Sequence, residues 1–165
     1  MHILYLFFLF LSTCLAADTV NLEGLFSIVE DYFGETAISS PAANSTTVRV
    51  GFDRVDQRLH KDWLFTKVDS NRSWYTIEHP VADGFIHFPE IKAGAQAVVT
   101  PTASSFFEVI ARSNARFTIQ PVEQPDPNNP LYWYVGEFRS GEERVLRLKS
   151  GRHDPGFSLI PHNSG

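Results

Sequence analysis

The feature that most constrains the fold of this chain is a short motif that occurs three times. An aromatic residue, a hydroxyl residue and an isoleucine follow one another at 26–28 (Phe-Ser-Ile), 75–77 (Tyr-Thr-Ile) and 117–119 (Phe-Thr-Ile). A second, looser motif alternates with it at 63–65 (Trp-Leu-Phe), 107–109 (Phe-Glu-Val) and 157–159 (Phe-Ser-Leu). Recurrence at a spacing of roughly 40–50 residues indicates a repeat architecture of three units.

Both motifs place apolar side chains at every second position, which is typical of a strand with one buried face. The same alternation and the intervening turn residues predict about four short strands per unit. They are expected at 24–29, 35–38, 47–52, 63–68, 74–78, 85–88, 95–100, 106–111, 116–121, 131–138, 144–149 and 157–161, with a loop at 39–46 and an Asp-Gly turn at 81–84. We find no helical period over ten or more residues beyond the first 16.

Twelve short strands in three repeats predict an all-β fold, the β-trefoil, in which six strands close a barrel and three hairpins cap one end. The repeated aromatic residues and isoleucines would then fill the barrel. We expect one domain over 17–165, with its core at about 22–161. An open β-sandwich or another small barrel is the alternative.

The first 16 residues are expected to lie outside this domain. An apolar run over 3–11 is followed by the small residues of 12–17, which is the pattern of a secretory signal with cleavage after Ala16. A membrane anchor is the alternative, but the run is shorter than the ~20 apolar residues that a spanning helix needs. The sequence therefore predicts a secreted, extracellular protein.

Cysteine content and net charge indicate how the protein is stabilised and which binding partners are disfavoured. Cys14 is the only cysteine, so the mature chain would contain no disulfide and would depend on packing and backbone hydrogen bonds. About 150 residues suffice for one such core. The net charge of −5 disfavours a general nucleic-acid binder or a binder of anionic membranes.

The sequence contains no recognisable catalytic motif, and we expect neither enzymatic activity nor a cofactor. It lacks a Gly-x-Ser-x-Gly elbow, a His-Glu-x-x-His motif and a glycine-rich phosphate loop. His79 and His87 fall on neighbouring predicted strands, where a shared metal is conceivable, but no pair of histidines has a known ligand spacing. We therefore predict no metal site.

Two sequons predict glycosylation. Asn44 begins Asn-Ser-Thr and Asn71 begins Asn-Arg-Ser, and both fall in predicted surface segments of a secreted chain.

Basic residues gather late in the sequence, and they permit two interpretations. In one, the outward face of the strand at 144–149 is simply solvated and carries no function. In the other, the segment 149–156 is a rigid exposed loop in which Lys149, Arg152 and His153 could enter the specificity pocket of a peptidase. Arg152, between glycine and a proline-containing turn, is the preferred contact.

A second candidate for an inhibitory loop precedes the third predicted strand. Pro41 would stiffen this segment, and Ala42 and Ala43 would suit a peptidase with a small specificity pocket. A glycan on Asn44 would hinder docking there.

Several segments, taken in order, resemble the fungal β-trefoil peptidase inhibitors of mushrooms, the mycocypins and their serine-protease-directed relatives. They are 63–65, Trp-Tyr-Thr-Ile at 74–77, Asp-Gly-Phe-Ile at 83–86, 107–109, 117–119 and Phe-Ser-Leu-Ile at 157–160. The resemblance implies a trefoil and an inhibitor of secreted peptidases, with the serine type preferred over the cysteine type. It transfers no inhibitory residue, because the reactive loop is not constant in that group.

A carbohydrate-binding β-trefoil lectin is the alternative function. The Gln-x-Trp signature of ricin-type lectins is absent, since Lys61, Ser105 and Pro155 stand where the glutamine would be. Another mode of sugar binding stays open. In either case we expect a monomer whose partner is a secreted peptidase or a glycan, not a nucleic acid.

Overall fold

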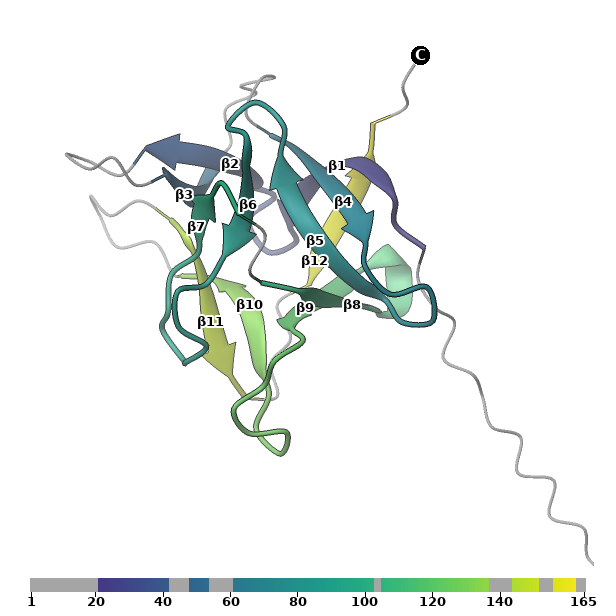
Figure 1. The fold of residues 1–165 in the computed structure, drawn as a ribbon, viewed down its shortest axis with the longest axis vertical. Coiled ribbons are helices and arrows are strands. Elements are labelled where there is room, and N and C mark those ends of the chain that lie inside the picture. The colour runs from purple at the N-terminus through teal and green to yellow at the C-terminus, as the bar shows by residue number, and fades with distance from the viewer. Residues whose placement is uncertain are drawn as a thin grey trace, which may run out of the picture.

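The computed structural model describes residues 21–41, 48–53, 61–102, 105–136, 144–151 and 156–162. These ranges contain twelve β-strands and one short 3₁₀ turn, Ser113–Ala115 (Figure 1). The strands are β1 (Gly24–Glu30), β2 (Thr36–Pro41), β3 (Val48–Asp53), β4 (Asp62–Lys67), β5 (Trp74–His79), β6 (Gly84–His87), β7 (Val98–Thr100), β8 (Phe107–Ala111), β9 (Phe117–Pro121), β10 (Leu131–Val135), β11 (Leu146–Ser150) and β12 (Phe157–Pro161). No helix among the described residues is long and apolar enough to cross a membrane.

Six of the strands close into a barrel. β1 pairs with β4, β4 with β5, β5 with β8, β8 with β9 and β9 with β12, and β12 returns to β1, all antiparallel. These are the first and fourth strands of each four-strand unit. Closure pairs strand edges that would otherwise be exposed.

The two middle strands of each unit form a hairpin, β2–β3, β6–β7 and β10–β11. β3 also pairs with β7. The segment 94–97 runs beside β11, where the backbone N–H groups of Gly94 and Ala97 donate to the carbonyls of Leu148 and Leu146. The three hairpins therefore cover one end of the barrel together, as the repeat predicts (Figure 1).

The repeated motifs supply the core. The side chains of Ile28, Ile77 and Ile119 are fully buried. Tyr75 is buried too, Phe26 is 8% exposed, and Phe117 packs against the core but stays half-buried. The second motif contributes six buried side chains, Trp63, Phe65, Phe107, Val109, Phe157 and Leu159. The predicted inward positions are thus confirmed, with Phe117 the least covered.

The structure corrects three local expectations. β2 continues to Pro41, which pairs with Val48, so the segment 39–41 is strand and not loop. The sequence predicts a turn that includes Gly84, but the positive φ of 48° belongs to Asp83, and Gly84 begins β6. Arg144 does not begin a solvated basic strand, because it is buried.

Candidate functional site

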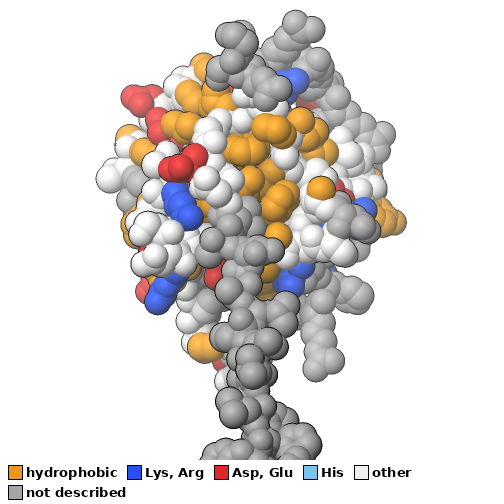
Figure 2. Space-filling model, turned by 90° about the vertical axis from the view of Figure 1, so that its right-hand side faces the viewer, with side chains coloured by type: hydrophobic (Ala, Val, Ile, Leu, Met, Phe, Trp, Pro, Cys, Tyr) orange, Lys and Arg blue, Asp and Glu red, His pale blue; other side chains and the backbone are white. Residues whose placement is uncertain are grey.

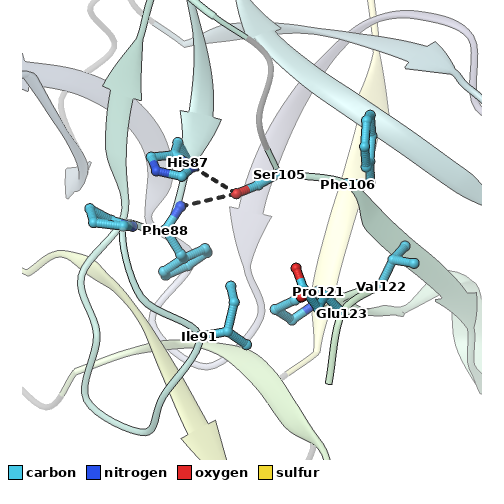
Figure 3. A pocket seen from close by; sticks show the side chains of 9 residues that line it. His87, Phe88, Ile91, Ser105, Phe106, Pro121, Val122 and Glu123 are labelled. Atoms are coloured by element: carbon cyan, nitrogen blue, oxygen red, sulfur yellow. Dashed lines mark hydrogen bonds between the residues drawn. The ribbon is translucent and has the colours of Figure 1, made fainter. Parts of the chain in front are cut away.

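The described residues form a pocket of about 300 Å³ at the junction between the second and third units. Its lining comes from the end of β6 and the residues after it, from the residues before β8, and from the turn after β9. These residues are His87, Phe88, Pro89, Ile91, Ser105, Phe106, Pro121, Val122 and Glu123. Figure 3 shows Phe88 and Ile91 on one side of the cavity and Phe106, Pro121 and Val122 on the other.

The pocket has an apolar floor and a mixed rim. Phe88 is only 2% exposed, whereas the side chain of Phe106, which also lines the pocket, is 46% exposed. Glu123 is also exposed. The backbone N–H of Val122 donates to the Phe106 carbonyl (2.9 Å). This hydrogen bond holds the turn after β9, in the third unit, against the residues before β8, in the second unit.

A small polar cluster lies beside the apolar wall. The hydroxyl of Ser105 accepts from the backbone N–H of Phe88 (3.3 Å) and lies 2.9 Å from Nδ1 of His87. Which of the two groups donates in the contact with Nδ1 depends on the tautomer of the imidazole. Burial lowers the pKa of His87 from its usual value, so the neutral imidazole is favoured.

The corresponding junction between the third and first units is built differently. There the backbone N–H of Asp31 donates to the Gly156 carbonyl (3.1 Å), as Val122 does to Phe106. Glycine thus replaces the exposed aromatic residue. A Cβ atom at Gly156 would collide with Oδ2 of Asp31, so the Asp31 carboxylate fills this space. The two junctions therefore differ in chemistry although their backbones correspond.

The turn between β1 and β2 presents a strongly exposed aromatic residue. Tyr32 is 83% exposed, and its ring packs edge-on against Phe33. The Glu30 carboxylate braces this turn, because it accepts hydrogen bonds from the backbone N–H groups of Tyr32 (3.0 Å) and Phe33 (2.7 Å). Tyr32 is therefore held in a tight turn, and its N–H is already engaged.

Apolar residues also lie along the outside of the barrel strands. Leu25 lies opposite Leu64 across β1 and β4, and Ser27 lies opposite Ile160, which is 52% exposed. Figure 2 shows hydrophobic side chains gathered over the middle of one face of the molecule. Single exposed apolar residues are normal on protein surfaces, so this region by itself indicates no site.

One serine, histidine and aspartate come together, but not as a catalytic triad. Oγ of Ser27 lies 2.7 Å and Oδ1 of Asp62 lies 3.2 Å from the same nitrogen, Nε2 of His162. A triad needs the nucleophile and the carboxylate on opposite ring nitrogens. Ser27 is also only 6% exposed. This cluster instead ties His162 to β1 and β4.

The proposed inhibitory residues fall partly outside the described ranges. Arg152, His153, Ala42 and Ala43 are not described, so the two candidate loops stay predictions. Lys149 is exposed within β11, opposite Tyr132, and its Nζ lies 4.7 Å from the ring centroid of Tyr134. Pro41 ends β2.

The predicted glycosylation sites also stay predictions. Asn44 lies outside the described ranges. Asn71 is exposed in the turn between β4 and β5, where its backbone N–H donates to Oδ1 of Asp69 (2.8 Å).

The two histidines considered for a metal lie in separate environments. Nδ1 of His79 accepts from the backbone N–H of Ala82, and its ring packs against Trp63, whereas His87 contacts Ser105. Among the residues that the structure describes, no group of three or more His, Cys, Asp or Glu is placed to hold a metal ion.

No sequence motif points directly to the pocket. From the sequence, Phe106 is predicted only to begin a strand. Ser105 is notable there only because it stands where the glutamine of the ricin-type signature would be. Strand alternation turns Phe106 away from the core because Phe107 points inward, which is a usable signal for exposure. The partners of Phe106 come from other loops, so its neighbours could not be inferred.

No protein-family model and no curated protein sequence matches this chain. Among solved structures, it is similar to the protein described as BEL beta-trefoil, with a TM-score of 0.64, 12% identity, and 87% of this chain and 97% of that chain covered. The chain has the β-trefoil fold.

Two further structural neighbours of this β-trefoil are named as an agglutinin and a lectin. The Rhizoctonia solani agglutinin has a TM-score of 0.69 at 11% identity, covering 88% of this chain and 100% of that one. The Macrolepiota procera ricin B-like lectin, in complex with lactose, has a TM-score of 0.65 at 12% identity, covering 87% and 99%. At such identities the likeness establishes the fold, which the resemblance to the mushroom inhibitors also implied.

Proposed function

We propose that this protein is a non-enzymatic carbohydrate-binding protein and that a sugar binds in the pocket between its second and third units. The observation that carries this proposal is the combination of an exposed aromatic ring, Phe106, with a few polar groups in one concave site. Ligand pockets typically have such a lining, mainly apolar with a small number of polar groups that fix orientation. The agglutinin and the lectin among the structural neighbours support the same function class.

The chemistry of a pyranose fits these groups. One face of a sugar ring presents C–H groups, which are attracted to the negative face of an aromatic ring such as that of Phe106. The carboxylate of Glu123 accepts hydrogen bonds from sugar hydroxyls, and hydrogen bonds to an ionised acceptor are stronger than neutral ones. The hydroxyl of Ser105 and the neutral imidazole of His87 supply further polar contacts beside the apolar wall.

A glycan array with the purified protein tests the proposal, followed by titration of the best ligand. Phe106→Ala should weaken binding about tenfold or more, corresponding to about 1.4 kcal/mol. Ile160→Ala is the matched control, because Ile160 is an exposed apolar residue of β12 outside the pocket lining. An array without any bound glycan, or equal weakening by both substitutions, would contradict the proposal.

Inhibition of a secreted serine peptidase is the second candidate function. The braced turn that presents Tyr32 favours it, because an ordered segment loses less conformational freedom on docking. The engaged N–H of Tyr32 disfavours a substrate-like, extended pose. A panel of secreted peptidases separates the two functions: inhibition together with a negative glycan array supports the inhibitor and excludes the lectin.

A further inference from the structure

The outer face of the β10–β11 hairpin combines two tyrosines with two cations. The hairpin turns its apolar residues into the core; these are Leu131, Trp133, Val135, Leu146 and Leu148. The alternate residues therefore lie on the opposite face, where Tyr132 pairs directly with Lys149 and Tyr134 with Arg147. Cross-strand neighbours of this kind have Cβ atoms about 4.5–5.5 Å apart, so the four side chains form one surface.

Both cations of this surface contact neutral groups. Nζ of Lys149 lies 4.7 Å from the ring centroid of Tyr134, diagonally across the hairpin. Arg147 forms a β-bridge with Gln96 of the neighbouring segment. With the Gln96 amide oxygen facing the guanidinium, that oxygen accepts hydrogen bonds from Nη2 (2.9 Å) and Nη1 (3.3 Å) of Arg147. Neither cation is paired with a carboxylate among the residues that the structure describes.

These two cations belong to a protein whose net charge is −5. Several other described cations are paired with carboxylates, as Arg116 is with Asp31, Arg144 with Glu35 and Lys92 with Glu90. Two cations that have no carboxylate partner among the described residues, beside tyrosine rings and hydroxyls, favour a ligand that has both an anionic group and a ring. Guanidinium groups match carboxylates and sulfates in a two-point geometry, and lysine supplies a second charge.

We propose that the outer face of the β10–β11 hairpin is a second site, which binds an acidic saccharide. Arg147 and Lys149 hold its carboxylate or sulfate group, and the rings and hydroxyls of Tyr132 and Tyr134 contact the sugar. A nucleic acid fits less well, because two cations in an acidic protein neutralise few phosphates. The site shares no residue with the lining of the pocket, so either site can fail without the other.

The experiment measures binding of the full chain to three probes: lactose, sialyllactose and lactose bearing one sulfate ester. The two acidic probes separate a carboxylate from a sulfate as the recognised anion. At low ionic strength we expect at least one acidic probe to bind about tenfold or more tightly than lactose. The preference should shrink as salt rises, because screening weakens interactions between exposed charges. Equal binding of all three probes would overturn the proposal.

Charge-removing variants then locate the site. Arg147→Gln and Lys149→Gln should each reduce the preference for the acidic probe about threefold or more, and together they should abolish it. Lys67→Gln, on β4 of the barrel, removes the same charge elsewhere and should leave the preference unchanged. Thermal unfolding of each variant verifies the fold. An equal loss in Lys67→Gln would show a general charge effect and overturn the proposal.

Two further measurements separate this site from its alternatives. The Phe106→Ala variant should still bind the acidic probe more tightly than lactose, even if its binding of neutral sugars is weakened, because Phe106 belongs to the pocket and not to the β10–β11 face. Loss of the preference in Phe106→Ala would assign the acidic probe to the pocket instead. A single-stranded oligonucleotide that binds more tightly than both acidic saccharides, with the same dependence on Arg147 and Lys149, would assign the face to nucleic acid and overturn the proposal.

Discussion

Nη1 of Arg144 lies 2.5 Å from Oε2 of Glu35, although 109 positions separate the two residues. The Arg144 side chain is 5% exposed, and Nη2 also lies 3.9 Å from the Glu30 carboxylate. Its guanidinium carbon sits 4.0 Å from the ring centroid of Phe33, and its Nε donates to the Gly136 carbonyl. One buried cation thus joins the first turn of the first unit to the residues just before β11 in the third.

Arg144→Leu should therefore destabilise the protein strongly. The substitution takes this counter-charge from the largely buried carboxylates of Glu30 and Glu35, and breaking a buried pair from one side costs about 3–5 kcal/mol. The free energy of unfolding in urea measures the effect. Arg147→Leu removes a half-buried cation from β11 that has no carboxylate partner among the described residues. This control should cost less than about 1 kcal/mol, and similar losses in both variants would contradict the account.

A pH dependence follows from His87. Burial lowers its pKa below the usual value of 6.5, so the unfolded chain binds this proton more readily than the folded protein does. The stability that His87 contributes is therefore fully present above pH 6.5 and is lost as the pH falls through the lowered pKa. His87→Gln should reduce the drop in melting temperature between about pH 7.5 and 5. The same drop in both proteins would argue against this origin.

Much of the fold could be predicted from the sequence, because the inward residues repeat at strand period. Ile28, Ile77 and Ile119 needed only local alternation to be assigned to the core, and their threefold recurrence selected the closed barrel. The polar residue that ends the barrel strand was harder to interpret. Glu30 and His79 occupy corresponding positions, and each accepts a backbone N–H from the turn that follows. The two side chains differ in chemistry, so no sequence motif reveals their common role.

The candidate sites could not be predicted in the same way. Local alternation predicts a solvated strand at Arg144. It could not reveal that Arg144 is buried, because its carboxylate partners lie more than 100 positions away in the sequence. The pocket draws on loops of two units, and its aromatic residue, Phe106, has glycine at the corresponding junction. Repetition identifies what the three units share, whereas this pocket depends on a position at which two of the units differ.

Gly84 is required for close packing and not for a positive φ. A Cβ atom at this position would lie 2.6 Å from Cγ1 of Val99 and 3.0 Å from the Thr100 carbonyl oxygen on β7. Gly84→Ala should therefore push β6 and β7 apart and cost about 1–3 kcal/mol, as overpacking usually does. At Gly136 the nearest atom to an added Cβ is 3.8 Å away, so Gly136→Ala is the matched control. Urea unfolding compares the two, and equal stabilities would refute the packing argument.

Trp63 and Trp133 are equally buried but differ in hydrogen bonding. Both side chains are at most 1% exposed. The indole N–H of Trp63 donates to the Ala37 carbonyl (3.0 Å), whereas Nε1 of Trp133 has no hydrogen-bond partner among the described residues. Substitution of either by phenylalanine removes the same volume from the core. The difference between the two variants therefore reports the hydrogen bond more than the cavity.

Trp63→Phe leaves the buried Ala37 carbonyl without its donor, and an unsatisfied buried group costs about 1–3 kcal/mol. Trp133→Phe removes a donor that has no partner among the described residues, which offsets part of the cost of the smaller side chain. We expect Trp63→Phe to be less stable than Trp133→Phe by about 1–2 kcal/mol, measured by urea unfolding at one pH. If Trp133→Phe is instead the less stable variant, the Trp133 indole must be satisfied in solution, and its ring contacts with Phe107 and Phe157 must dominate the core.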